Sequence, residues 1–574
     1  MPLTRFLPFL RWFPMKGDIL KADFMAGITV ALVLIPQSMA YAQLAGLPAY
    51  YGLYAAFLPV AVAALWGSSN QLGTGPVAVV SLLTASSLTV FAAPGSPDFV
   101  ALAIMLALLV GVIQLLLGVF KLGVIVNFLS HPVIVGFTNA AAIIIGLSQV
   151  SKLFGVPMGR SEHFIQDIVG VARLIGDTHL PTLAMGVAAI ALMWAIRKYQ
   201  PKWPGVLIAV ALTTTLSWAM GFEQTLGGKV VGAIPEGLPS VAAPRLDMDK
   251  LGSLLSAALV ISLVGFMEAI SIAKAIAART KQRLDPNQEL VGQGLANIAG
   301  SFTQAFPGSG SFSRSAVNIN AGAKTGMSSV FTALFVLLTL LFLTPLLYHL
   351  PQAVLAAIII MAVIGLVNFQ AVKHAWHANR HDGIAAVVTF IATLAFAPHL
   401  DNGIMVGAGL ALVLFLMRTM KPRVAQLGRY KDGTLRDISV NPGLPTSEHV
   451  VAMRFDGQLY FANVSFFEDT VLTALADHPK ATYFLVVGDG INQLDASGEE
   501  VIHHLVERLR GAGVELVFSG LKKQVLDVMR ATGLFDLITQ ANIFATEDQA
   551  LAAIYERLGD VAKDDLFCLV KAAA

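Results

Sequence analysis

The 574-residue chain is 56% hydrophobic and only 13% charged, about half the charged share of an ordinary soluble domain. This composition indicates a membrane protein and excludes a wholly soluble globular chain. The formal net charge of +2 carries no information about partners, and the single cysteine, Cys568, excludes an intramolecular disulfide and a multi-cysteine metal site.

Fourteen apolar segments precede residue 430, and each is a candidate membrane span because about 20 apolar residues cross a bilayer. The candidates lie roughly at 22–45, 50–66, 74–92, 99–120, 126–149, 181–197, 203–221, 251–278, 287–301, 310–322, 326–347, 351–368, 382–398 and 402–420. The third and the tenth are short and begin at clusters of glycine with proline or serine.

Lysine and arginine gather in alternate loops, beginning with the N-terminal segment that holds Arg5, Arg11, Lys16 and Lys21. The opposite loops FAAPGSPD, YHLPQ and FAPHLDNG hold none. Because loops rich in these residues stay in the cytoplasm, we expect both termini to be cytoplasmic and the number of spans to be even.

Two helices are predicted to start in mid-membrane. In NQLGTGPVAVVSLLTASS we expect a helix to begin around Gly75-Pro76, since proline suits the first helical turn. In FPGSGSFSRSAV the expected start is just after Gly310, with Arg314 one turn inside. Helix starts expose N–H groups and partial positive charge, so two facing starts make an anion cradle. The alternatives are that each cluster is only a tight loop and that Arg314 snorkels to the interface.

The two halves of the chain share a similar spacing between a polar interruption and a predicted helix start. IPQSMAY lies about 38 residues before the first predicted helix start, and GFMEAIS lies about 43 before the second. A polar interruption followed by a half-helix in each half predicts an inverted repeat of seven plus seven spans.

Glu268 is an acid well inside the apolar segment SAALVISLVGFMEAISIAKAIAART. A carboxylate inside the membrane is a functional hypothesis by default, through proton relay, ion ligation or pairing. The alternative is a structural ion pair with Arg314 or Lys274. Asn297 is predicted to join neighbouring helices rather than to bind a ligand.

Several stretches carry a family resemblance. LVLIPQSMAYAQLAGLPAYYGLYAAFLP, GTGPVAVVSLL, ELVGQGLANIAGSF and GSFSRSAVNINAGAKT follow one another in the order found in the sulfate permease family, known in animals as solute carrier family 26. The resemblance implies an all-α, polytopic membrane domain of 14 spans with a uracil-permease-like inverted repeat. It also implies core and gate domains and a homodimer in the cell membrane.

The resemblance also implies site residues. The six residues that it places around the anion are Gln37, Tyr41, Ala78, Phe312, Ser313 and Arg314. Glu268 matches the position of the proton-coupling acid in plant-type sulfate symporters. Without the resemblance, Gln37 could simply bond a neighbouring helix and Tyr41 could be packing.

The expected function is proton-coupled sulfate uptake by alternating access, with the anion held between the starts of half-helices 3 and 10. The alternatives are a sodium- or proton-coupled bicarbonate or dicarboxylate symporter and an anion exchanger of the same family. We expect a transporter and no enzyme, with no cofactor, no metal and no nucleic acid as partner. INAGAKTG lacks the ending of a P-loop.

Charged residues return at soluble density near residue 430. We expect a transmembrane domain at 1–430, a linker at 431–447 and a cytoplasmic α/β domain at 448–574, where strand and helix patterns alternate. DGQLYFANV and INQLDASGEEV resemble the STAS domain, related to bacterial anti-sigma factor antagonists, in which a serine at the place of Ser497 is phosphorylated. The alternative is that Ser497 and Glu500 form a capping box at a helix start.

Overall fold

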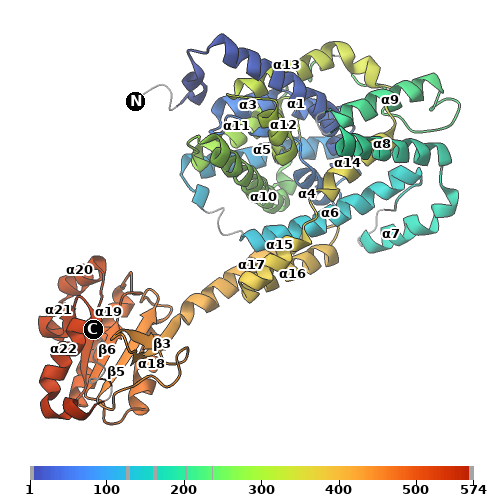
Figure 1. The fold of residues 1–574 in the computed structure, drawn as a ribbon. Helices are drawn as coiled ribbons and strands as arrows, with labels where there is room; N and C mark the ends of the chain where they lie inside the picture. Colours follow the sequence, from blue (N-terminus) through green and yellow to red (C-terminus); the bar gives the residue numbers. More distant parts are fainter. Residues whose placement is uncertain are drawn as a thin grey trace. The chain divides into compact units, whose positions relative to one another are not determined.

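The computed structural model describes residues 6–124, 130–159, 164–200, 203–235, 237–565 and 567. It divides into two compact units, Met1–Ala411 and Leu412–Ala574, which Figure 1 draws in sequence colours. Cys568 lies outside the described residues.

The first unit is helical. Its helices are α1 (Gly17–Leu44), α2 (Tyr51–Ala55), α3 (Leu58–Trp66), α4 (Ala78–Leu88), α5 (Pro97–Val119), α6 (His131–Phe154), α7 (Phe164–Arg173), α8 (Leu180–Tyr199), α9 (Gly205–Ala219), α10 (Met248–Thr280), α11 (Pro286–Phe302), α12 (Phe312–Asn320), α13 (Met327–Leu338), α14 (Gln352–Ile364), α15 (Phe369–Ala378), α16 (Arg380–Ala395) and α17 (Leu400–Met420). Every one of the fourteen apolar segments contains helix. Among the described residues, eight helices are long and apolar enough to cross a membrane, and three apolar helices are shorter.

A two-stranded sheet joins the two halves of this unit. Strands β1 (Gly73–Gly75) and β2 (Ser309–Ser311) pair antiparallel, with Thr74 opposite Gly310. In each half a long helix (α1 or α10) is followed by a second helical segment (α2–α3 or α11), then a strand, then a short helix (α4 or α12). The pairing therefore brings the starts of α4 and α12 to the same place in the fold.

The predicted starts of the short helices are close to the observed ones. Ser311 is the N-cap of α12, and its hydroxyl accepts the backbone N–H of Arg314, so the start just after Gly310 is confirmed. Helix α4 begins at Ala78, two residues later than predicted. The reason is that Gly75 is still extended in β1 and has φ +139°, a left-handed conformation that favours glycine.

The second unit is an α/β domain. Its strands are β3 (Arg423–Arg429), β4 (Leu435–Asp437), β5 (Val450–Asp456), β6 (Tyr483–Val487), β7 (Glu515–Ser519) and β8 (Ile543–Phe544). The sheet order is β4-β3-β5-β6-β7-β8, parallel from β5 to β8 and antiparallel at β3 and β4. The helices are α18 (Val464–Ala476), α19 (Ala496–Gly511), α20 (Lys523–Thr532), α21 (Leu534–Ile538) and α22 (Glu547–Leu558). Both faces of the sheet are buried under apolar side chains.

The β3–β4 hairpin lies before residue 448, so the sheet includes residues that the sequence analysis gave to the membrane domain and the linker. Asp437 ends this hairpin and accepts hydrogen bonds from Ser439 Oγ (2.6 Å), Ser439 N (2.8 Å) and Arg423 Nη2 (2.8 Å). The Ser439 hydroxyl first, and the Arg423 guanidinium after it, hold the pKa of Asp437 below its ordinary value of 3.8.

The predicted capping box at Ser497 is wrong. Helix α19 has Asp495 as its N-cap, and the Asp495 carboxylate accepts the backbone N–H of Gly498 (2.8 Å) and of Phe461 (2.9 Å). Asp495 is the N-cap, and through Phe461 it also joins the loop between β5 and α18 to the helix start. Ser497 is the second helical residue and is half-buried, so capping does not account for it.

Candidate functional site

Arg314 lies at the centre of the paired helix starts. It is the third residue of α12 and is 0% exposed. Its Nη1 donates to the carbonyl oxygen of Pro76 (2.8 Å), two residues before α4. Its Nε and Nη2 are buried and have no hydrogen-bond partner among the described residues. The guanidinium therefore links the two helix starts and keeps two charged donors unused.

Strand β1 is built for close approach by this side chain. A Cβ at Gly73 would lie 3.0 Å from Cβ of Arg314, and one at Gly75 would lie 3.4 Å from its Nη2. Glycine at both positions lets the backbone lie against the arginine. The two glycines of GTGP thus leave room for Arg314, which comes from the other half of the chain.

Glu268 and Tyr41 complete the charged centre. Glu268 (α10) and Arg314 interact electrostatically, and both interact with Tyr41 (α1), which is 5% exposed. Oε2 of Glu268 is buried and has no partner in the described part of the chain. The carboxylate and the guanidinium therefore lie near each other, and each keeps polar atoms without a partner among the described residues.

The remaining predicted site residues lie around this centre. Gln37 is on α1 one turn before Tyr41 and is 6% exposed; its Oε1 is buried and unpartnered among the described residues. Ala78 is the first residue of α4. Phe312 (66% exposed) and Ser313, also exposed, are the first two residues of α12. The second helix start thus has an open side.

Two further buried carboxylates were missed by the sequence analysis. Asp23 (α1) is 0% exposed and accepts hydrogen bonds from Lys324 N (2.6 Å), Thr325 N (3.1 Å) and Thr325 Oγ1 (2.5 Å). Glu289 (α11) is 2% exposed and accepts the backbone N–H groups of the loop before β1. Their positions within the apolar segments 22–45 and 287–301 were the available signal.

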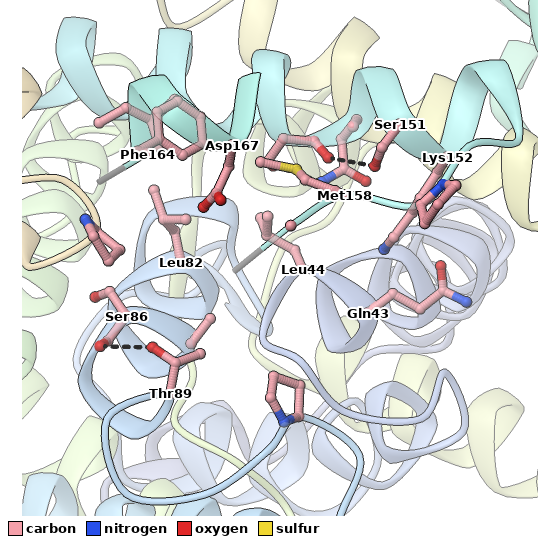
Figure 2. Close-up of a pocket in the computed structure, with 18 of the residues that line it drawn as sticks. Gln43, Leu44, Leu82, Ser86, Thr89, Ser151, Lys152, Met158, Phe164 and Asp167 are labelled. Carbon is pink, nitrogen blue, oxygen red and sulfur yellow. Dashed lines mark hydrogen bonds between the residues drawn. The ribbon is translucent and has the colours of Figure 1, made fainter. Parts of the chain in front are cut away.

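A cavity of about 920 Å³ opens between α1, α4, α6 and α7. Figure 2 shows Leu82 and Ser86 of α4 on one wall, with Lys152 of α6 and Asp167 of α7 across from them. Leu82 lies one turn beyond Ala78, and the α1 lining begins just after Tyr41. The cavity is therefore lined by the helices that carry Tyr41 and Ala78, although none of the six predicted anion residues lines it.

Comparison with known proteins identifies the family. The model of the sulfate permease family matches residues 20–389, and the model of the STAS domain matches residues 441–550. The chain belongs to the sulfate permease family. The predicted family, the helical membrane fold and the C-terminal STAS domain are confirmed, and the chain is an anion transporter rather than an enzyme.

Relatives in the family extend over almost the whole chain. Sulfate transporter 4.1, chloroplastic, of Arabidopsis thaliana is 35% identical over 569 residues, which are 96% of this chain and 82% of that protein. Probable sulfate transporter Rv1739c of Mycobacterium tuberculosis (strain ATCC 25618 / H37Rv) is 32% identical over 541 residues, 94% of this chain and 96% of that protein.

Solved structures share the fold. Murine Slc26a9, an anion transporter in the inward-facing state, superimposes with a TM-score of 0.87 at 23% identity, covering 96% of this chain and 94% of that chain. The transmembrane domain of the cyanobacterial bicarbonate transporter BicA gives a TM-score of 0.60 at 22% identity, covering 69% of this chain and 98% of that chain. At these identities the likeness concerns the fold alone.

Proposed function

We propose that this sulfate permease family member takes up sulfate together with protons by alternating access. The anion binds between the starts of α4 and α12, in contact with Gln37, Tyr41, Ala78, Phe312, Ser313 and Arg314. The membrane unit crosses the cell membrane fourteen times, both termini and the STAS domain face the cytoplasm, and the protein is a homodimer. The relatives named as sulfate transporters support the choice of anion.

One observation carries the proposal: Arg314 is fully buried between two helix starts with two guanidinium nitrogens unpartnered among the described residues. A buried cation without a full set of partners is costly in a membrane. An oxyanion at the helix starts would accept from these nitrogens and from the free backbone N–H groups of α4 and α12. Such a site suits a compact oxyanion.

Glu268 is the proposed proton carrier. Moving a divalent anion into a cell with about 100 mV negative inside costs roughly 4.6 kcal/mol, so uptake needs co-transported cations or a counter-anion. A proton on Glu268 removes a negative charge beside Arg314 and so favours the anion. When the proton leaves, the carboxylate competes for the guanidinium and favours release. Proton and anion would therefore bind together.

The test is radiolabelled sulfate uptake into proteoliposomes with an inward proton gradient and no sodium. We compare the wild type with Glu268→Gln and with the control Asp249→Asn, which removes an exposed carboxylate from the first turn of the same helix. We expect gradient-driven accumulation by the wild type and the control. Glu268→Gln should retain only downhill exchange.

Other outcomes would refute parts of the proposal. Equal accumulation by Glu268→Gln would remove Glu268 from coupling. Sulfate exchange without any response to the proton gradient in the wild type would indicate an exchanger. Bicarbonate flux on adding sodium, without sulfate flux, would indicate a sodium-coupled bicarbonate symporter.

A further inference from the structure

Helix α11 carries a stripe of three buried polar residues that the transport mechanism does not use. Glu289, Gln293 and Asn297 follow one another at four-residue spacing, which puts them on one face of the helix. They are 2%, 0% and 4% exposed. We call Glu289, Gln293 and Asn297 the α11 stripe. Buried polar side chains in a membrane helix need partners, and the partners of this stripe identify its role.

The stripe holds strand β1 at two points. Oε2 of Glu289 accepts the backbone N–H of Ser68 (2.9 Å) and of Ser69 (3.0 Å), in the loop that leads into β1. Nε2 of Gln293 donates to Oγ1 of Thr74 (3.0 Å), the middle residue of β1, and lies 3.4 Å from Oε1 of Glu289.

The stripe also holds the backbone directly before strand β2. Oδ1 of Asn297 accepts the backbone N–H of Gly308 (2.9 Å), and Nδ2 donates back to the carbonyl of Gly308 (3.2 Å) and to Oε1 of Gln114 on α5 (3.0 Å). Gly308 directly precedes β2. The prediction that Asn297 joins neighbouring helices is confirmed by its bond to Gln114 of α5, and Asn297 also holds the backbone that leads to α12.

Helix α11 is itself held firmly. A Cβ at Gly294 would lie 2.5 Å from the backbone nitrogen of Leu115 on α5, and one at Gly292 would lie 2.6 Å from Cα of Gly67 after α3. Such contacts between small residues allow close backbone packing in membranes. In Figure 1, α11 lies with α3 and α5. The stripe is thus a fixed reference for both strands.

We propose that the α11 stripe sets the spacing of the two helix starts and thereby determines which oxyanion fits between them. Glu289, Gln293 and Asn297 are positioning residues that do not touch the anion. This inference rests on the proposed anion site between α4 and α12. It predicts that loosening one stripe contact changes anion selectivity more than turnover.

The test compares Gln293→Met with Gln288→Met in the full chain. Gln288 is on the same helix and donates to the carbonyl of Trp66 (2.6 Å), so its loss removes a hydrogen bond without touching β1 or β2. Uptake of sulfate and of the larger molybdate gives KM and kcat for each variant. We expect the ratio of the two KM values to change about threefold to tenfold in Gln293→Met, as one ordinary hydrogen bond allows. Gln288→Met should retain the wild-type ratio.

A second measurement does not depend on the substrate. Hydrogen exchange of peptides covering 73–76 and 308–311 should quicken in Gln293→Met and stay at the wild-type rate in Gln288→Met. Unchanged exchange and unchanged selectivity would overturn the inference. If exchange quickens but the wild type transports neither oxyanion, the proposed function fails while the positioning role of the stripe stands.

Discussion

Arg314 offers the sharpest test of the anion site. The substitution Arg314→Gln removes the buried charge, the donors Nε and Nη2, and the Nη1 that bonds the carbonyl of Pro76. Arg314→Lys keeps the charge but loses the planar fork that binds an oxyanion through two atoms. The two variants therefore separate charge from geometry.

The expected loss of sulfate affinity follows from the unpartnered guanidinium nitrogens of Arg314. Two are free to donate, and a hydrogen bond to a charged group contributes about 1.5–3 kcal/mol. Loss of one such bond weakens binding roughly 10- to 150-fold, so we expect Arg314→Lys to lie in this range. Arg314→Gln should weaken sulfate binding further, by at least the same factor again. Because Arg314 forms no ion pair in the described part of the chain, we expect neither variant to melt far below the wild type.

The assay is sulfate titration of the purified full chain, with thermal stabilisation by sulfate as the signal. Lys324→Gln is the matched control, because it removes a positive charge ten residues later, where only the backbone N–H binds Asp23. If Arg314→Gln binds sulfate within threefold of the wild type, Arg314 does not hold the anion. Equal losses in Arg314→Gln and Lys324→Gln would instead indicate a general effect of charge.

Three further predictions concern the cavity and the STAS domain. In a Cys568→Ser background, an anionic methanethiosulfonate should label Ala85→Cys in the cavity, and sulfate should slow the labelling. A labelling rate that sulfate does not change would show that the cavity is not part of the anion path. Because the folded pKa of Asp437 is lowered, its contribution to stability is complete above about pH 4 and is lost as the pH falls through the folded value. The protection of β3 amides against hydrogen exchange, taken relative to the intrinsic rate at each pH, should therefore fall in acid in the wild type but not in Asp437→Asn, and parallel pH profiles of protection would contradict this. Asp495→Ala should destabilise the start of α19 by about 1 kcal/mol in hydrogen exchange. Ser497→Ala should have little effect on the start of α19. A larger loss of stability in Ser497→Ala than in Asp495→Ala would support the capping box instead.

The sequence was sufficient for the short helices and the arginine because the relevant rules are local. Glycine and proline disfavour the interior of a helix, so the clusters GTGP and PGSG indicate where a helix begins, and both helix starts could be placed within two residues. Arg314 was conspicuous because a charge is rare in apolar sequence. The strand pairing that joins the two halves was not predicted, since each strand has only three residues and no alternating pattern.

The features that the sequence analysis predicted wrongly or missed depend on contacts with distant parts of the chain. Asp495 and Ser497 are both good N-caps, and the N–H of Phe461 selects Asp495. The polar turn between β3 and β4 resembled a linker because only pairing with β5 reveals the strand. Asp23 and Glu289 escaped notice because their partners are 301 and 221 residues away in sequence.

The carboxylates of Asp23, Glu289 and Glu268, all on helices of the membrane unit, differ in one property that bears on coupling. Asp23 and Glu289 each accept three hydrogen bonds from neighbouring groups, which hold both carboxylates in place. Glu268 keeps an oxygen without a partner among the described residues, beside a guanidinium with two spare nitrogens. A carboxylate that can gain and lose a proton without breaking the fold is what coupling requires. The hydrogen bonds of Asp23 and Glu289 make these residues structural anchors, whereas the unpartnered oxygen of Glu268 is the reason that we propose Glu268 for proton coupling.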